Sequence, residues 1–414
     1  VEARINAAYG EPFQWMPDAR TLLVQLIPEG RGRPPEPPAV PVGPTVQEGS
    51  GRPTPVRTYQ DLLRTPHDEA LFEYYARAQL ALVDIADGRL VRVGSPDIFQ
   101  MIEPSPDGRY LLVARVHRPY SYLVPHTAFP KEVEVWDRSG RLVHKLASLP
   151  LQEHVPIEGV PTGPREYAWR PTEPATLVWV EALDEGDPRK RVPYRDRLMM
   201  LKAPFTDAPI EVLKLEHRFA GLQWGERGGW AFVRDYDRNR RWRRTFLIYP
   251  DDRTIAPRLV WSLNVQDRYN DPGTPVLRLL PNGQRVIQQH GEWIFLIGAG
   301  ASPEGERPFL DRFNVRTLTS ERLFRCDERS YETIIALLRD DGTEVLTRRE
   351  TPTDPPNYYV RTLSGGQATA LRALTRFSDP TPQLRKIKRQ LVTYQREDGV
   401  QLSFTLYLPP DYTE

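Results

Sequence analysis

The chain has 414 residues, enough for two or three ordinary domains or for one large repetitive β domain with a sizeable core. Its 56 basic and 55 acidic side chains leave a net charge of +1, which excludes a global electrostatic attraction to nucleic acid or to an anionic membrane. The single cysteine, Cys326, excludes an internal disulfide and any multi-cysteine metal site, so we expect a core thiol.

The composition favours an all-β fold. Pro and Gly, at 42 and 27 residues, interrupt the chain too often for long helices, whereas 18 Tyr, 14 Phe and 9 Trp supply aromatic side chains that half-buried strands favour. No apolar run approaches the roughly 20 residues that span a bilayer, so we expect a soluble chain without a membrane partner. Because the chain starts at Val1 rather than Met, we expect that its N-terminus is truncated. We favour the cytoplasm as its compartment and leave a periplasmic or organellar location open.

A recurring phrase organises the chain. Each copy has a Trp or other apolar residue, a turn with Pro, Asp or Gly, and an apolar strand, and each is followed by a second strand pair. The copies lie 55 to 89 residues apart and begin at Trp15, Pro104, Trp169, Trp224, Leu279 and Leu338. Four short strands per unit of about 40 to 50 residues are typical of propeller blades, so we predict a β-propeller with six recognisable blades.

The largest gap between copies holds an insertion over residues 28–78. Its first part is too rich in Pro and Gly for regular structure. The stretch "TPHDEALFEYYA" then predicts a helix, because Thr65 is a good N-cap and Pro66 suits the first helical position. The expected apolar face consists of Leu71, Phe72 and Tyr75. The insertion is a candidate binding surface, and a structural plug is the alternative.

Two further stretches have structural explanations. The basic run "DRNRRWRRTF", residues 237–246, could bind nucleic acid, but we favour a solvated blade edge because the net charge is near zero. The stretch "GAGASPEG", residues 298–305, lacks the phosphate-loop patterns and predicts a long hairpin loop. None of the seven His residues has metal-ligand spacing, so we expect no metal and no other cofactor.

The chain closes on a predicted strand pair. Residues 394–396 and 402–408 alternate apolar and polar side chains around Asp398-Gly399, and Pro409-Pro410 follows as a stop. Such an element normally opens a domain. We therefore expect that further sequence has been removed after it.

Four phrases, read together, are similar to the glutamyl endopeptidase branch of the prolyl oligopeptidase serine peptidases. They are "VRTYQDLLRTPHDEALFEYYA", "ARVHRPYSYLVPHTAFPKEVEVWDRSGRLV", "GASPEGERPFLD" and "TYQREDGVQLSFTLYLPPDY". The resemblance extends from about Glu11 to the last residue. It implies an N-terminal propeller, usually of seven blades, followed by an α/β-hydrolase domain, so one blade is expected to be missing.

The resemblance also implies that the catalytic Ser, Asp and His lie beyond this chain. In the family, the phrase that matches the terminal strand pair leads into the hydrolase sheet, and the triad follows it. No G-x-S-x-G nucleophile elbow occurs in the sequence. We therefore expect no catalytic residue here and no peptidase activity of the chain alone.

The candidate substrate-binding residues follow from the expected preference for Glu. Such a peptidase must neutralise a carboxylate, which Arg does bidentately. The Pro-bounded segment after Arg115 carries the first candidate, Arg118, with His117 and Tyr120 beside it. The alternative is that Arg118 pairs with a carboxylate of a blade and that Tyr120 packs. Arg57 and Arg165 occupy comparable segments between strands and are further candidates.

These observations predict two domains: a propeller over residues 1–390, with the insertion 28–78, and the start of a truncated hydrolase domain over residues 391–414. The expected function is the substrate-gating propeller of a serine endopeptidase that cleaves after Glu. Its expected partners are peptides and its own hydrolase domain, with an oligomer left open. A stand-alone propeller that binds proteins is the alternative.

Overall fold

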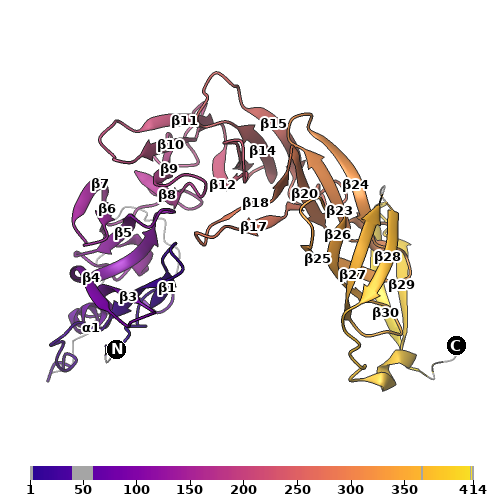
Figure 1. Ribbon diagram of the computed structural model, residues 1–414, viewed down its shortest axis with the longest axis horizontal. Helices are drawn as coiled ribbons and strands as arrows, with labels where there is room; N and C mark the ends of the chain where they lie inside the picture. The colour runs from indigo at the N-terminus through magenta and orange to yellow at the C-terminus, as the bar shows by residue number, and fades with distance from the viewer. Residues whose placement is uncertain (1–2, 40–58, 365–366, 411, 413–414) are drawn as a thin grey trace.

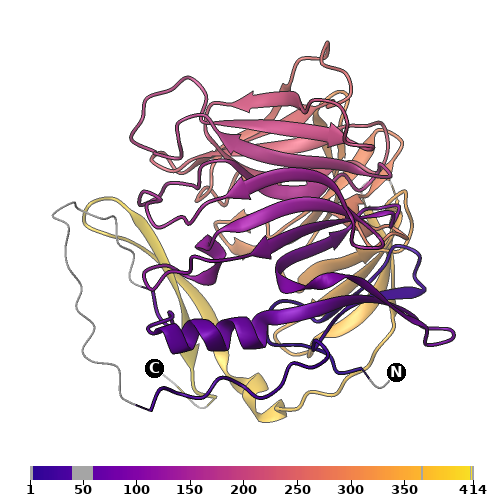
Figure 2. The same ribbon diagram turned by 90° about the vertical axis from the view of Figure 1, so that its left-hand side faces the viewer.

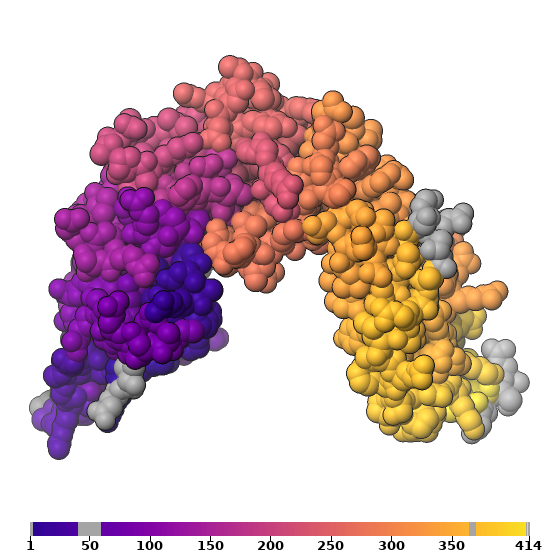
Figure 3. All heavy atoms as spheres, in the orientation of Figure 1, coloured from indigo at the N-terminus to yellow at the C-terminus, as the bar shows by residue number. Residues whose placement is uncertain are grey.

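The computed structural model describes residues 3–39, 59–364, 367–410 and 412. The chain forms a succession of antiparallel sheets that fan around an open arc, with the first and last sheets at its two ends (Figure 1). The space-filling view shows the concave side of the arc as a broad hollow between these ends (Figure 3). The all-β propeller architecture expected from the sequence is confirmed, and the number of blades stays a prediction.

The first sheet has seven strands, and one long strand belongs to both of its halves. Its strands, in spatial order, are β1 (Phe13–Trp15), β2 (Thr21–Leu26), β3 (Arg77–Asp84), β4 (Leu90–Pro104), β5 (Tyr110–Val116), β6 (Lys131–Asp137) and β7 (Leu142–Leu149). The first half of β4 pairs with β3, and its second half pairs with β5. The strand bends at Gly94, where φ is +59° and a Cβ would lie 3.0 Å from the Trp136 ring, so only glycine suits this position.

The next two sheets have four strands each. The second consists of β8 (Pro164–Trp169), β9 (Thr176–Ala182), β10 (Asp196–Lys202) and β11 (Ile210–Leu215). The third consists of β12 (Arg218–Trp224), β13 (Ala231–Asp237), β14 (Trp242–Ile248) and β15 (Arg258–Asn264). In both sheets the strands are adjacent in the order of the sequence, as expected for blades.

The remaining sheets continue the arc. One sheet contains β16 (Thr274–Pro275), β19 (Gln289–His290), β20 (Trp293–Gly298), β23 (Phe309–Asn314) and β24 (Thr319–Arg325). Two short strand pairs lie beside it. They are β17 (Leu277–Leu279) with β18 (Arg285–Ile287), and β21 (Ala301–Ser302) with β22 (Gly305–Glu306). The β21–β22 pair lies in the predicted hairpin loop. The last four-stranded sheet contains β25 (Tyr331–Leu337), β26 (Glu344–Glu350), β27 (Asn357–Ser364) and β28 (Gln367–Ala373).

The hydrophobic core lies between successive sheets. One buried layer joins β6 to β9, with Val133 and Val135 packed near Leu177 and Trp179. Further layers join the second sheet to the third and each later sheet to its neighbour. Cys326, a free and buried thiol, belongs to one of these layers, as predicted.

The predicted helix and terminal strand pair are both present. Helix α1 (Pro66–Ala76) runs directly into β3 (Figure 2). At the other end of the chain, β29 (Lys388–Gln395) and β30 (Gln401–Leu408) form a hairpin that pairs with no other strand among the described residues. Two short 3-10 turns, His126–Ala128 and Pro382–Lys386, complete the described elements, and no helix among them is long and apolar enough to cross a membrane.

Candidate functional site

Helix α1 presents two carboxylates from one face. The helix begins with a capping box: Thr65 accepts a hydrogen bond from the Asp68 backbone N–H at 3.1 Å, and Asp68 accepts one from the Thr65 backbone N–H at 2.9 Å. The cap and Pro66 fix the start of the helix. Because Glu69 and Glu73 are four residues apart, they lie one above the other on this helix.

Arg118, in the loop after β5, is bound by both of these carboxylates. Its Nε donates to Glu73 Oε1 at 2.8 Å, and its Nη1 pairs with Glu69. Its guanidinium lies 5.0 Å from the centre of the Tyr120 ring, and the Tyr120 hydroxyl donates to Glu73 Oε1 at 3.0 Å. The hydrogen bonds to Glu73 and then to Glu69 raise the pKa of Arg118. A substrate carboxylate would therefore compete with two acidic side chains for this guanidinium.

Aromatic packing holds the same loop against the helix. The Phe72 ring makes edge-to-face contacts with Tyr9, Tyr120 and Phe129, with ring centres 5.2 to 5.8 Å apart. Tyr120 and Phe129 are buried members of this cluster. Burial, followed by the hydrogen bond to Glu73, raises the pKa of Tyr120 above its usual value. The insertion helix is thus docked by both apolar and ionic contacts.

His117 adjoins Arg118 but has different partners. Its Nδ1 lies 2.7 Å from the Arg118 carbonyl oxygen, and its Nε2 lies 3.6 Å from Glu132 Oε1. Glu132 is shared with Lys145, whose Nζ lies 2.8 Å from its other oxygen. His117 therefore lies beside the ion pair of Glu132 on β6 and Lys145 on β7.

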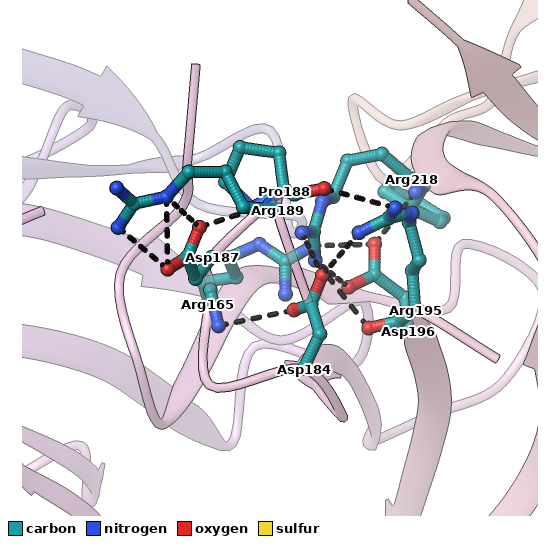
Figure 4. Close-up of polar contacts among 10 residues, drawn as sticks. Arg165, Asp184, Asp187, Pro188, Arg189, Arg195, Asp196 and Arg218 are labelled. Carbon is teal, nitrogen blue, oxygen red and sulfur yellow. Dashed lines mark hydrogen bonds and ion pairs between the residues drawn. The ribbon is translucent and has the colours of Figure 1, made fainter. Parts of the chain in front are cut away.

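Arg165 lies in the second sheet, within a buried charge network (Figure 4). Its Nη2 donates to Asp196 Oδ2 at 2.6 Å, and the exposed fractions of the two side chains are 11% and 0%. Arg218 links Asp196, at 2.7 Å, to Asp184, at 2.6 Å. Arg195 adds a second guanidinium to Asp184 at 2.8 Å. Three guanidiniums thus surround two fully buried carboxylates, and these side chains come from β8, β10, β12 and the segment between β9 and β10.

This network gives Arg165 a structural explanation. Charges removed from water need close partners, and each Asp here accepts from at least two donors. The Phe219 backbone N–H also donates to Asp196 at 2.6 Å, which ties the second sheet to the third. Sequence reasoning did not identify Asp184, Asp196 or Arg218. One signal for a buried charge was the position of Asp196, which lies on the same face of β10 as Leu198 and Met200, and both of these residues are buried.

The structure therefore brings three of the five candidates together. His117, Arg118 and Tyr120 share one loop, Arg165 lies in the next sheet, and Arg57 lies outside the described residues. In the described ranges, no group of three or more His, Cys, Asp or Glu side chains could hold a metal ion. The loop can bind charge and fix the helix, and its histidine contacts a carbonyl and a carboxylate rather than a serine hydroxyl.

A buried lysine lies at the base of this loop. Lys131 Nζ lies 2.5 Å from Gln100 Oε1 and 2.6 Å from the Thr127 carbonyl oxygen. Only 9% of Lys131 is exposed, and burial lowers its pKa to about 8. Burial, followed by the charge of Lys131, lowers the pKa of His126, which is bound to the Tyr9 hydroxyl at 2.8 Å.

The basic run requires a correction. It occupies the turn between β13 and β14 and continues into β14, which pairs with β13 on one side and β15 on the other. The predicted blade edge is therefore wrong for the strand, because β14 is internal to its sheet, whereas residues 238–241 in the turn are exposed as predicted. Arg244 is instead held by Asp235, with bonds of 3.0 and 2.6 Å, and by Glu216 at 2.7 Å.

No protein family model matches the chain. Two curated proteins are similar over nearly all of it, and both are named "Probable glutamyl endopeptidase, chloroplastic". The protein from Oryza sativa subsp. japonica is 40% identical over 99% of this chain and 45% of its own length, and that from Arabidopsis thaliana is 39% identical over 99% and 44%. The chain therefore spans less than half the length of these relatives.

Solved structures give weaker similarity. Prolyl oligopeptidase B from Galerina marginata is 10% identical, with a TM-score of 0.46 over 97% of this chain and 47% of its own. Dipeptidyl peptidase 4 from Porphyromonas gingivalis is 12% identical, with a TM-score of 0.41 over 100% of this chain and 66% of its own.

Proposed function

Because this chain belongs with the curated glutamyl endopeptidases, we propose that it is the substrate-gating propeller of a serine endopeptidase that cleaves peptides after Glu. In this proposal a separate α/β-hydrolase domain supplies the nucleophilic Ser and its His and Asp partners. The propeller covers that domain and admits extended peptides. The observation that carries the proposal is the 40% identity over nearly the whole chain.

The terminal hairpin supports a second domain. Among the described residues, β29 and β30 pair only with each other, and Phe404 and Tyr407 are 48% and 60% exposed. Unpaired strand edges and exposed aromatic side chains favour association with another surface. The relatives are more than twice as long as the stretch they share with this chain, which supports a covering domain of the same polypeptide.

In this proposal the loop of Arg118 positions the insertion helix. Glu69 and Glu73 occupy its Nη1 and Nε, which supports a docking role more than direct contact with a substrate Glu. Both relatives are named chloroplastic, which supports the organellar alternative for the compartment.

The proposal is tested by peptide cleavage with the protein extended to the length of its relatives. A fluorogenic peptide with one internal Glu and its Gln twin are compared, with this chain alone as control. Selective cleavage after Glu by the extended protein, and none by the chain alone, is the expected result. Turnover by the chain alone that survives repurification would overturn the division into two domains.

A further inference from the structure

Two arginines of the third sheet share one of its faces. Arg234 on β13 is paired with Thr245 on β14 and with Gly221 on β12, and Tyr236 is paired with Arg243. Residues directly opposite each other in antiparallel strands project from the same face. Arg234 and Arg243 therefore lie on one face of the sheet, with one residue pair, Asp235 and Arg244, between their own pairs. Strand β12, at the inner edge of this sheet, faces the concave side of the arc (Figure 1).

Gly221 lets the Arg234 side chain cross the inner strand. A Cβ at Gly221 would lie 2.9 Å from Arg234 Nη2 and 3.3 Å from its Nε, so the guanidinium occupies the space that a side chain would fill. Gly221 has a φ of +134°, in a range that favours glycine, and it lies at a register shift in the pairing of β12 with β13. The backbone of β12 is thus shaped to carry the guanidinium toward the hollow of the arc.

Neither arginine has a counter-charge among the described residues. Arg234 is half-buried, its Nε is buried with no hydrogen-bond partner there, and no described carboxylate lies within 4.0 Å of either guanidinium. Burial, followed by the positive charge of Arg243, lowers the pKa of Arg234. Arg244, one residue further along β14, has Asp235 and Glu216 as partners on the opposite face.

An unpaired, half-buried cation beside a second cation is costly unless an anion binds there. The planar guanidinium offers parallel N–H groups that match the two oxygens of a carboxylate. We propose that Arg234 and Arg243 form a carboxylate-binding site on the concave side of the arc, which holds an acidic side chain of a peptide. The identity of the ligand as a peptide rests on the proposed function.

Peptide binding to this chain tests the site directly. The probe is a short peptide with one internal Glu and blocked termini, and its twin carries Gln. We expect the Glu peptide to bind about ten- to a hundred-fold more tightly than the Gln peptide at low salt. Arg234→Gln and Arg243→Gln should each abolish this preference. Arg253→Gln is the matched control, since Arg253 is exposed in the turn between β14 and β15 and the variant loses the same charge.

Thermal unfolding without ligand separates a binding role from a structural one. Because Arg234 has no carboxylate partner in the described part of the chain, Arg234→Met should leave the Tm unchanged or raise it, while the Glu preference is lost. A lower Tm for Arg234→Met, or an unchanged Glu preference in both Gln variants, would overturn the proposal.

A third set of titrations identifies the source of the carboxylate. A Gln peptide with a free C-terminus that binds as tightly as the Glu peptide would contradict the side-chain assignment. Inorganic phosphate that competes with equal affinity would reduce the site to a general anion site and contradict the peptide assignment. These titrations need no cleavage. Failure of the site would leave Glu-selective proteolysis intact, and failure of proteolysis would leave carboxylate binding intact.

Discussion

Arg118 Nε donates to Glu73 Oε1 at 2.8 Å, which joins the loop after β5 to a helix 45 residues earlier in the chain. Because both side chains come from segments outside the sheets, this pair fixes the insertion on the arc without contributing to a core.

Loss of this pair should loosen the helix without unfolding the chain. Arg118→Ala is expected to cost less than about 1 kcal/mol, because the side chain is half exposed and the ion pairs are screened by solvent. Amide hydrogen exchange in α1 should become faster. In the extended protein kcat/KM should fall by the same factor for Glu and Gln peptides. A loss confined to Glu peptides would return Arg118 to the substrate pocket. Arg189→Ala, which removes an exposed pair with Asp187, is the control.

A substitution in the buried charge network around Asp184 and Asp196 should lower the stability of the chain much more than Arg118→Ala does. Asp196→Asn leaves Arg165 and Arg218 without a full counter-charge in a buried position, and we expect a loss of about 3–5 kcal/mol in the free energy of unfolding. Asp187→Asn, at the solvent-screened pair with Arg189, should cost far less. Urea unfolding of both variants makes the comparison, and equal costs would contradict a stabilising role for the network.

Lys131 should make stability depend on pH in the alkaline range. Burial lowers its pKa to about 8 from the ordinary 10.5, so between these values the unfolded chain binds more protons than the folded one. Stability therefore rises with pH across this window, by up to about 3 kcal/mol from this group, and the penalty is fully present below pH 8.

Comparison with Lys131→Met isolates that contribution. As the pH rises from 8 to 10, the free energy of unfolding of the native chain should increase relative to that of the variant. Lys214→Met, at an exposed lysine, should show no such shift. A difference independent of pH would show that Lys131 titrates normally in the folded chain.

The terminal hairpin should promote self-association of the isolated chain. Replacing Phe404 and Tyr407 with Ser removes exposed aromatic surface from β30 and should lower the apparent mass in sedimentation at high concentration. Tyr269→Ser removes a similarly exposed ring elsewhere in the chain. If that control lowers association equally, the hairpin is not the associating surface.

The sequence predicts the features of the fold that depend on residues adjacent in the chain. Thr65, Pro66 and the acidic first turn predict α1, and alternation around Asp398-Gly399 predicts the last hairpin, because caps and turns depend on adjacent residues. The recurring Trp-turn-strand phrase predicts the succession of antiparallel sheets for the same reason.

Ion pairs between residues that are far apart in the sequence cannot be predicted from adjacent residues. Arg118, Arg165 and Arg234 carry the same side chain, yet the first is bound by a helix, the second by a buried Asp, and the third by no described carboxylate. These differences depend on which sheets become neighbours. Arg234 reaches inward only because Gly221 lies opposite it, a register that no local pattern specifies.

The most direct test of the proposed function is the kcat/KM of the protein, extended to the length of its relatives, for two peptides that differ only in Glu or Gln before the scissile bond. Loss of one charge-assisted pair is worth about ten- to a hundred-fold, so we predict at least about a ten-fold preference for Glu. Replacing the nucleophilic Ser of the added segment should stop the cleavage of both peptides. Equal rates for the two peptides, or no cleavage of either, would contradict the assignment of this chain to a Glu-selective endopeptidase.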